Sequence, residues 1–402
     1  MFNYMKQVLI LLLVVISITM ELNAQTKKEI FKFKEDINNQ LEKDTLPWRF
    51  QSAAVDYSIS GNYIKALQTW DMQGAKKITL SVNDSLYFDK FKPTNAKDYI
   101  INRSKKERVI IINEAHNNSR HRVFTTSLLK DLYKNGYRYL GVEALEDTLI
   151  NKRKFPSLES GSLYLHESQY SNLIKEALDL GFTLFNYEYT YVKGKTGKDR
   201  EIEQAANIAK MMALHPNDKF LIHCGYDHLN EGIPGIKSWE KAMAARLSDS
   251  TGVNPFTIDQ IQCSEKGSPE FNNPYIRITN QVKPAIMVNA NAETFNGPEG
   301  KGVGDCRIIH PVTLYKKGRP DWLYLDGRRK AYRIKTDAIP EFPVLALAYR
   351  NNEFEKEGVP ADVIEITNKE QEANFIIDKG LYRIIIKNRE YKTIFDYQEQ
   401  IN

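Results

Sequence analysis

The sequence has few cysteines and no strong excess of charge of either sign. Its 402 residues include three cysteines, and 56 basic residues nearly balance 51 acidic ones, which leaves a formal net charge of +5. An odd number of cysteines leaves at least one thiol unpaired, so a pure disulfide scaffold is excluded. Because nucleic-acid-binding proteins usually carry a basic stripe, the balanced charge also argues against a nucleic-acid partner.

Long hydrophobic runs are absent except at the N-terminus. Residues 1–25 contain one early lysine, Lys6, then an apolar run over about 8–20, and end in small residues around Ala24. This order is typical of a secretory signal peptide cleaved near Ala24. The uncharged run is shorter than the roughly 18–20 residues that a membrane span needs, which favours cleavage over a retained anchor. We therefore expect an exported, periplasmic or extracellular protein with no stable membrane span after cleavage.

The middle of the chain alternates between strand-like and helix-like segments. Apolar runs predict strands at 109–113, 137–145, 182–189, 220–226 and 254–261. Helical spacing predicts helices at 119–135, 167–180, 199–214 and 238–249. Strands that alternate with helices of this length predict an α/β fold, with a mostly parallel sheet flanked by helices.

The two ends of the chain differ from this middle region. Before it, residues 26–90 are predicted to be helical, with a hairpin over 47–71 that turns at Gly61. After it come short β-like runs, which we place at 275–279, 284–289, 308–315 and 318–334. Residues 340–402 are rich in strand patterns and are interrupted by proline. We therefore expect a helical N-terminal region over 26–90, an α/β domain over 91–339 and a small accessory β-rich domain over 340–402.

Each predicted strand of the α/β domain ends in residues that can do chemistry. Glu114 and His116 follow the first strand, Glu143 ends the second, Glu188 ends the third, and Tyr226 and His228 follow the fourth. In an open parallel sheet, ligands bind at the carboxyl ends of the strands. Solvated turns would be rich in Lys, Ser and Gly instead, so this pattern indicates an active site.

Two helix starts add further candidates beside these strand ends. His121 and Arg122 lie in the first turn of the helix after the first strand, where backbone N–H groups favour anions. Arg200 starts the helix before the fourth strand. We take His121, Arg122, Glu188, Arg200 and Tyr226 as candidate substrate-binding residues. His223 lies inside a strand beside Cys224, and both are interpreted as buried core residues.

The order of these motifs resembles one superfamily, which joins the erythromycin esterases, the ChaN-like haem-binding lipoproteins and the TraB/Tiki proteins. "NEAHNNSRH" is similar to the ChaN-like Gly-Glu-x-His turn with a second histidine five residues later, and "GVEAL" to the strand that ends in glutamate. "REIEQAANIAKMMALHPNDKF" and "GYDHLNEG" match an Arg…Asn-Ile helix before a Gly-x-x-His strand end. The resemblance covers about 90–262. Asn113 replaces the usual glycine, and the first Glu and His are two apart rather than three, so macrolide hydrolysis is not implied.

The residues leave three hypotheses open: a hydrolase, a binding protein on the same scaffold, and a purely structural envelope protein in which the polar cluster is vestigial. As a hydrolase of an ester or amide bond, the protein would use His116 as a general base, oriented by Glu114 or Glu143. His228, Tyr226 or Arg200 would then stabilise the oxyanion. No Gly-x-Ser-x-Gly elbow is present, which disfavours a covalent serine mechanism.

The alternative is an envelope protein that binds haem or a metal on the same scaffold. Tyr226 and His121 are the candidate axial haem ligands, since both residue types ligate haem iron. The cluster of carboxylates and histidines also suits a divalent metal ion, so a metal cofactor stays open under either function. The expected partner is a small-molecule or peptide substrate.

Overall fold

A large parallel sheet forms the centre of the protein. The structure is a computed structural model that describes residues 29–232, 235–299 and 301–402. Within these residues eight strands form one sheet, in the order β1-β7-β8-β6-β2-β5-β3-β4. The strands are β1 (Phe91–Asn95), β2 (Val109–Glu114), β3 (Tyr137–Val142), β4 (Thr183–Asn186), β5 (Lys219–Gly225), β6 (Phe256–Asp259), β7 (Ala285–Asn289) and β8 (Cys306–Ile309). Neighbours pair in parallel except at β7, which is antiparallel to β1 and β8. The α/β fold with a mostly parallel sheet is confirmed.

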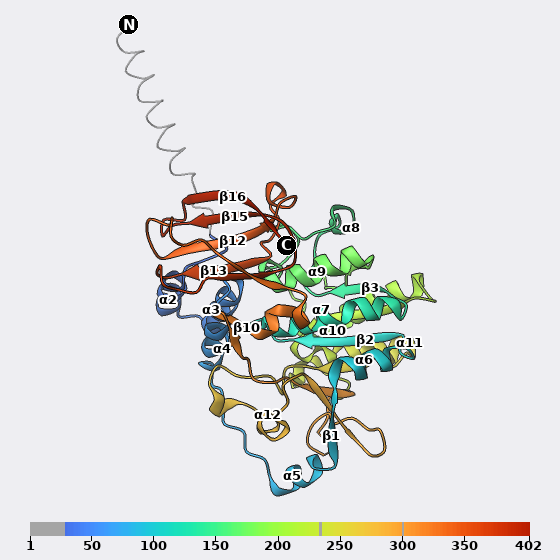
Figure 1. Ribbon diagram of the computed structural model, residues 1–402. Helices are drawn as coiled ribbons and strands as arrows, with labels where there is room; N and C mark the ends of the chain where they lie inside the picture. Colours follow the sequence, from blue (N-terminus) through green and yellow to red (C-terminus); the bar gives the residue numbers. More distant parts are fainter. Residues whose placement is uncertain (1–28, 233–234, 300) are drawn as a thin grey trace, which may run out of the picture. The chain divides into compact units, whose positions relative to one another are not determined.

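Helices cover both faces of this sheet (Figure 1). Because β2 is buried on both sides, its apolar run is continuous: Ile110 and Ile112 pack on one face, and Val109 and Ile111 pack on the other. The first face is covered by α6 (Ala96–Ser104), α7 (Ser119–Lys134) and α9 (Ser168–Leu180). The second face is covered by α10 (Gly197–Leu214) and α11 (Met243–Thr251).

Local signals set the ends of these helices much as the sequence predicts. The Asn118 side chain caps α7 by accepting from the Arg120 N–H at 3.3 Å. Gly181 ends α9 in a left-handed conformation, with φ +100°. A capping box between Thr196 and Asp199 starts α10. The helix predicted at 238–249, α11, begins at Met243, because Lys237–Trp239 forms a separate short 3₁₀ turn, η3.

The N-terminal region is helical, and the predicted hairpin is confirmed. It contains α2 (Lys34–Lys43), α3 (Arg49–Ile59), α4 (Tyr63–Asp71) and α5 (Val82–Phe88). Gly61 makes the turn between α3 and α4 with φ +76°. A Cβ at this position would lie 2.1 Å from the Val363 carbonyl oxygen, so the hairpin packs against a C-terminal strand where only glycine fits.

Antiparallel sheets make up the C-terminal part. One sheet has the order β13-β12-β15-β16, and β11 pairs with β14. The strands are β11 (Lys330–Arg333), β12 (Val344–Arg350), β13 (Asp362–Ile366), β14 (Asn374–Ile377), β15 (Gly380–Lys387) and β16 (Thr393–Ile401). The β11–β14 pair joins segments from both sides of the domain boundary expected near 339. Residues Phe31–Asn402 form one compact unit.

Three of the expected β-like runs are not strands along their length. Residues 308–315 are strand only up to Ile309, the end of β8, and again at Tyr315, where β9 begins. Residues 275–279 lie in a helix, α12 (Pro274–Thr279), because Asn273 caps it and Pro274 has the fixed φ that suits a first helical turn. Residues 318–334 contain only the short β10 (Arg319–Pro320), which pairs with β9 (Tyr315–Lys316), then a 3₁₀ segment η5 (Asp321–Gly327), and β11. The remaining short elements are α8 (Ile150–Arg153), η1 (Leu163–His166), η2 (Tyr226–Leu229), η4 (Pro269–Phe271) and η6 (Phe354–Lys356).

The expectations about export and thiols have different outcomes. The predicted signal peptide lies outside the described residues. In the described part of the chain, no helix is both long and apolar enough to cross a membrane. All three cysteines are buried and free, as expected for Cys224.

Candidate functional site

The strand order brings the predicted polar residues to one edge of the sheet. Strands β2, β5, β3 and β4 are consecutive neighbours, and the carboxyl ends of all four meet at this edge. Glu114 at the end of β2 pairs in register with Gly225 at the end of β5. Val142 pairs with His223, which places Glu143 beside the end of β5.

Glu114 is a buried carboxylate held by an arginine. Its Oε2 accepts from Nε of Arg122 at 2.6 Å and its Oε1 from Nη2 at 2.7 Å, and both side chains are at most 1% exposed. Burial favours the neutral acid, but the Arg122 charge outweighs it and holds the pKa of Glu114 well below its usual range. Arg122 also donates to Glu167, at the N-terminus of α9, at 2.9 Å. Glu114 is therefore a fixed anion at the end of β2.

The two oxygens of Glu114 also orient two histidines. Nδ1 of His116 lies 2.9 Å from Oε1, and Nε2 of His223 lies 3.1 Å from Oε2. Since an ionised carboxylate only accepts, Nδ1 of His116 carries a proton toward Glu114, so in the neutral ring Nε2 is the nitrogen with the free lone pair. The His116 ring stacks on Tyr164 with centroids 3.9 Å apart, and its side chain is 13% exposed. Its Nε2 is thus positioned and has no hydrogen-bond partner among the described residues.

Glu143 is the second buried carboxylate of the site. Its Oε2 accepts from the Gly225 N–H, and its Oε1 accepts from Nη2 of Arg200 at 2.8 Å. Burial alone would raise the pKa of Glu143, but the charges of His228, His116 and Arg200 together lower it to about 2. A Cβ at Gly225 would lie 2.7 Å from Nε2 of His116 and 3.1 Å from Oε2 of Glu143. The glycine therefore leaves the two groups facing each other.

His228 forms a second histidine–glutamate pair on the other side of Glu143. Its Nδ1 lies 2.7 Å from Oε1 of Glu201, and its Nε2 lies 3.7 Å from Oε1 of Glu143. Burial disfavours the imidazolium, but the two carboxylates outweigh it and raise the pKa of His228. The ring stacks on Trp239, with centroids 5.1 Å apart and an interplanar angle of 12°.

Arg200 and Glu188 form the more exposed part of the cluster. The Arg200 guanidinium donates to both oxygens of Glu188, at 2.9 and 2.6 Å, and its side chain is 28% exposed. Glu188 also accepts from Gln204 at 2.9 Å. Within the described residues Nη1 of Arg200 makes no hydrogen bond, so it can donate to a bound molecule.

Two of the predicted site residues have other roles, and the histidine interpreted as a core residue is buried as expected. His121 is fully buried, with Nδ1 accepting from the Ala115 N–H at 3.0 Å and Nε2 lying 2.7 Å from Ser264 Oγ. Burial lowers its pKa to about 3, so it is a neutral core histidine with no nitrogen to offer. Arg122 has no exposed surface, so it positions Glu114 and cannot touch a substrate. His223 is buried, as interpreted from the sequence, with Glu114 as its partner.

Tyr226 is held in an unusual conformation beside His116. Its φ is +40°, which is rare for a bulky residue and costs about 1–3 kcal/mol. The Asn113 side chain donates to its carbonyl at 2.9 Å and Trp70 stacks on its ring at 5.6 Å, while the ring edge meets His116 at 5.0 Å. The hydroxyl is buried close to the His116 backbone without a well-formed hydrogen bond. Tyr226 therefore forms a wall of the site.

The described residues do not provide an obvious metal or haem site. Nowhere in them do three or more His, Cys, Asp or Glu side chains form a group that could hold a metal ion. Glu114 already accepts four hydrogen bonds, and Arg122 and Arg200 place positive charge where a divalent cation would bind. As a haem ligand, His121 would have to break one of its two ring contacts.

Several residues of the site were missed by the sequence analysis. They are Trp70, Tyr164, Glu167, Glu201 and Trp239. Glu201 could have been found, because it follows Arg200 directly at the start of the same helix. The others come from a distant hairpin, from loops or from a helix start, and no spacing rule connects them with the strand ends.

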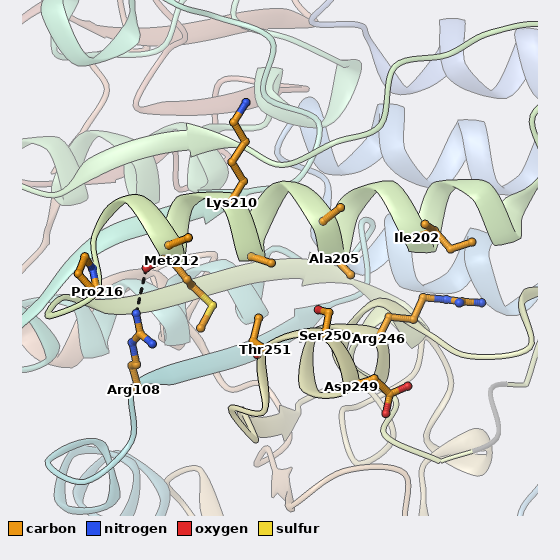
Figure 2. A pocket seen from close by; sticks show the side chains of 13 residues that line it. Arg108, Ile202, Ala205, Lys210, Met212, Pro216, Arg246, Asp249, Ser250 and Thr251 are labelled. Atoms are coloured by element: carbon orange, nitrogen blue, oxygen red, sulfur yellow. Dashed lines mark hydrogen bonds between the residues drawn. The ribbon is translucent and has the colours of Figure 1, made fainter.

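A wide groove of the described structure lies elsewhere. It runs between α10 and α11, with a volume of about 900 Å³, and alanines and the stem of Met212 line its floor (Figure 2). Arg108 lies at one end, where it donates to the Met212 carbonyl at 3.0 Å (Figure 2). None of the predicted catalytic residues line this groove. Its lining residues include no histidine and no glutamate, so the strand-end cluster remains the candidate site.

Comparisons with known proteins add little to this geometry. No family model and no curated protein matches the chain. The type III effector HopBA1 is similar over 45% of this chain and 93% of its own, with 11% identity and a TM-score of 0.30. RRSP, a MARTX toxin effector domain from Vibrio vulnificus CMCP6, is similar over 56% of this chain and 42% of its own, with 16% identity and a TM-score of 0.27. Likenesses this weak carry no argument about function.

Proposed function

We propose that this protein is an exported hydrolase that activates water on an ester or amide bond by acid–base catalysis. One observation carries the proposal: His116 and His228 are each backed at Nδ1 by a buried glutamate, and both approach the same carboxylate, Glu143. A core histidine needs only one partner. Two oriented imidazoles on either side of one anion are an arrangement suited to moving protons.

In this mechanism His116 is the general base. Its free Nε2 takes a proton from a water molecule as the water oxygen bonds to the carbonyl carbon. Nε2 of His116 and Oε2 of Glu143 face each other across Gly225, so one water can bridge them. Glu114 stabilises the imidazolium that forms, and such a positioned base contributes roughly 10²–10⁴-fold in rate.

The remaining groups act on the carbonyl oxygen and on the leaving group. The free Nη1 of Arg200 is the exposed donor that can stabilise the oxyanion. His228, whose raised pKa favours the imidazolium, donates the Nε2 proton to the leaving oxygen or nitrogen as its bond to carbon breaks. Glu143, with a pKa of about 2, stays ionised and holds its cationic neighbours in place.

The test is hydrolysis of a panel of simple esters and peptides by the purified protein. His116→Ala should lose turnover on the best substrate found and keep the unfolding transition of the wild type. A matched control is His215→Ala, which removes a half-exposed histidine that bonds Tyr139, outside the site. Equal turnover of wild type and His116→Ala would reject the mechanism.

Export is tested separately from catalysis. N-terminal sequencing of the protein recovered outside the cytoplasm should start near Gln25, where the signal-peptide pattern ends. An intact Met1 in a membrane fraction would instead indicate a retained anchor. Either result leaves the chemistry of the site open, so the two parts of the proposal can fail independently.

A further inference from the structure

A surface whose residues are not part of the strand-end site combines exposed apolar residues with lysines. Three separate segments each place the two kinds of residue next to one another. Ile78 follows two lysines and is 42% exposed, Val282 precedes a lysine and is 84% exposed, and Leu314, 60% exposed, begins the run Leu-Tyr-Lys-Lys. We call this surface the lysine–apolar patch, and its residues are Lys76, Lys77, Ile78, Arg277, Val282, Lys283, Leu314, Tyr315, Lys316 and Lys317.

The three segments lie around one groove. Ile78, Val282 and Leu314 all line a groove of about 610 Å³ beside α12. A smaller neighbouring groove shares Val312 with it and is bordered by Tyr315, which is 53% exposed. Residues far apart in the sequence therefore place exposed apolar side chains around one groove, whose lining also includes Lys77 and Arg277.

The charge on this patch is mostly unbalanced. The five lysines and Arg277 are exposed, and none of the six forms an ion pair with another described residue. Two acidic residues, Glu270 and Asp321, line the same groove. The patch thus concentrates positive charge in a chain whose formal net charge is only +5.

We infer that the lysine–apolar patch docks the protein on an anionic lipid surface. Lysines beside exposed apolar side chains fit the boundary of a membrane, where the ammonium groups meet lipid phosphates and the apolar groups enter the acyl region. Tyr315 beside Leu314 adds the amphipathic ring that membrane interfaces favour. A folded protein partner would have to match six unpaired cations with ordered acids, whereas a lipid surface supplies mobile anions to all of them. The inference stands without the proposed catalytic function.

The experiment measures binding of the full chain to vesicles by sedimentation. One set contains phosphatidylcholine alone, and the other contains phosphatidylcholine mixed with phosphatidylglycerol. The wild type should bind the anionic vesicles, and its affinity should fall steeply with added salt because the contact is electrostatic. Replacing the five patch lysines by glutamine should weaken this binding by roughly a hundredfold or more. The N-terminal segment is the same in all variants, so their differences report the patch.

A matched control removes the same charge from other surfaces. It replaces five exposed lysines outside the patch by glutamine: Lys130, Lys152, Lys154, Lys210 and Lys379. This variant should bind like the wild type. A third variant, Val282→Ser with Leu314→Ser and Tyr315→Ser, should bind anionic vesicles more weakly while its salt dependence is unchanged.

Three results would overturn the inference. The first is equal loss of binding in the patch and control lysine variants, which would indicate net charge alone. The second is equal binding to both kinds of vesicle, or to neither. The third is an apolar triple variant that changes self-association by sedimentation velocity but leaves vesicle binding intact, which would make the patch an interface between copies of this chain.

Discussion

The two histidine–glutamate pairs of the site use the same residue types but differ in geometry and surroundings: Nδ1 of His116 is hydrogen-bonded to Glu114, whereas Nδ1 of His228 lies 2.7 Å from Glu201 without hydrogen-bond geometry. In each, a buried glutamate contacts Nδ1 of a histidine. Nε2 of His228 lies 3.7 Å from Glu143, and Nε2 of His116 lies next to Gly225, beside Oε2 of Glu143. Glu114 shares its charge with the Arg122 guanidinium, which binds both of its oxygens. Glu201 has no such cation among the described residues, and its second oxygen accepts only the Met243 N–H, at 2.7 Å.

In the proposed mechanism, this difference assigns His116 the role of base and His228 the role of acid. His228 faces two carboxylates, and they raise its pKa, which favours the charged form that can donate a proton. His116 has a carboxylate whose charge is already neutralised by Arg122, and its second nitrogen is free to accept. The proposal therefore rests the two proton roles on the presence of Arg122 beside Glu114 and the absence of an equivalent cation beside Glu201 among the described residues.

The largest expected effect comes from changing the glutamate that holds the arginine. Glu114→Gln removes the anion that binds two nitrogens of the fully buried Arg122 and leaves it only the contact with Glu167, and breaking such a pair costs about 3–5 kcal/mol. Glu201→Gln leaves no buried arginine unpaired, since Glu201 contacts His228 and the Met243 N–H. His228, unlike an arginine, can lose its charge by releasing a proton. Urea unfolding should therefore show a large loss of stability for Glu114→Gln and a much smaller loss for Glu201→Gln.

A companion variant checks the cause of that loss. Arg122→Met combined with Glu114→Gln removes both charges together, so it should recover part of the stability lost by Glu114→Gln alone. Suppose instead that the double variant loses more stability than Glu114→Gln and Arg122→Met lose together as single variants. The ion pair is then not what distinguishes the two histidine–glutamate pairs.

The next largest effect concerns the acid. His228→Gln should slow cleavage of substrates with a poor leaving group by about a hundredfold, because general acid catalysis helps most where the leaving group needs a proton. An activated nitrophenyl ester should be cleaved almost as fast as by the wild type. Steady-state kinetics on a matched pair of esters measures this contrast. The same loss on both esters would mean that His228 acts on the oxyanion instead of the leaving group.

The sequence predicts the fold better than the site, for a physical reason. The sheet follows from local patterns, since the apolar run at β2 and the glycine that ends α9 act over a few residues. The same kind of pattern is misleading at α12. The aromatic and β-branched residues of 275–279 suggest a strand, but Pro274 and the Asn273 cap start a helix.

The site depends on partners that are distant in the chain. Glu114 and His116 were predicted because they follow one strand, and the structure pairs them directly. The alternative orienting group, Glu143, forms no hydrogen bond with His116 and instead contacts Arg200 and Gly225. Position in the chain does not reveal burial. Arg122 was a substrate-binding candidate because it lies in the first turn of a helix, but its side chain is fully buried.

A smaller effect is expected from the central carboxylate. Glu143→Gln keeps the shape of the side chain but removes the charge between His116 and His228, so kcat should fall by about tenfold with KM little changed. If both glutamates serve His116, the decrease in kcat of the double variant should be smaller than the product of the decreases for Glu143→Gln and Glu114→Gln, because one change already disables the base. Simple multiplication in the double variant would show that Glu143 acts on His228 alone.

The smallest effect is a pH dependence of stability that belongs to His228 alone. Its pKa in the folded protein is raised above the value of 6.5 for a free side chain, because Glu143 and Glu201 outweigh its burial. The imidazolium therefore stabilises the fold fully below pH 6.5, and this contribution is lost as the pH rises through the folded pKa. The difference in urea midpoint between wild type and His228→Gln should accordingly shrink above pH 6.5. A difference that stays constant or grows with pH would mean that His228 is neutral in the folded protein, and the contrast between an acid and a base would fail.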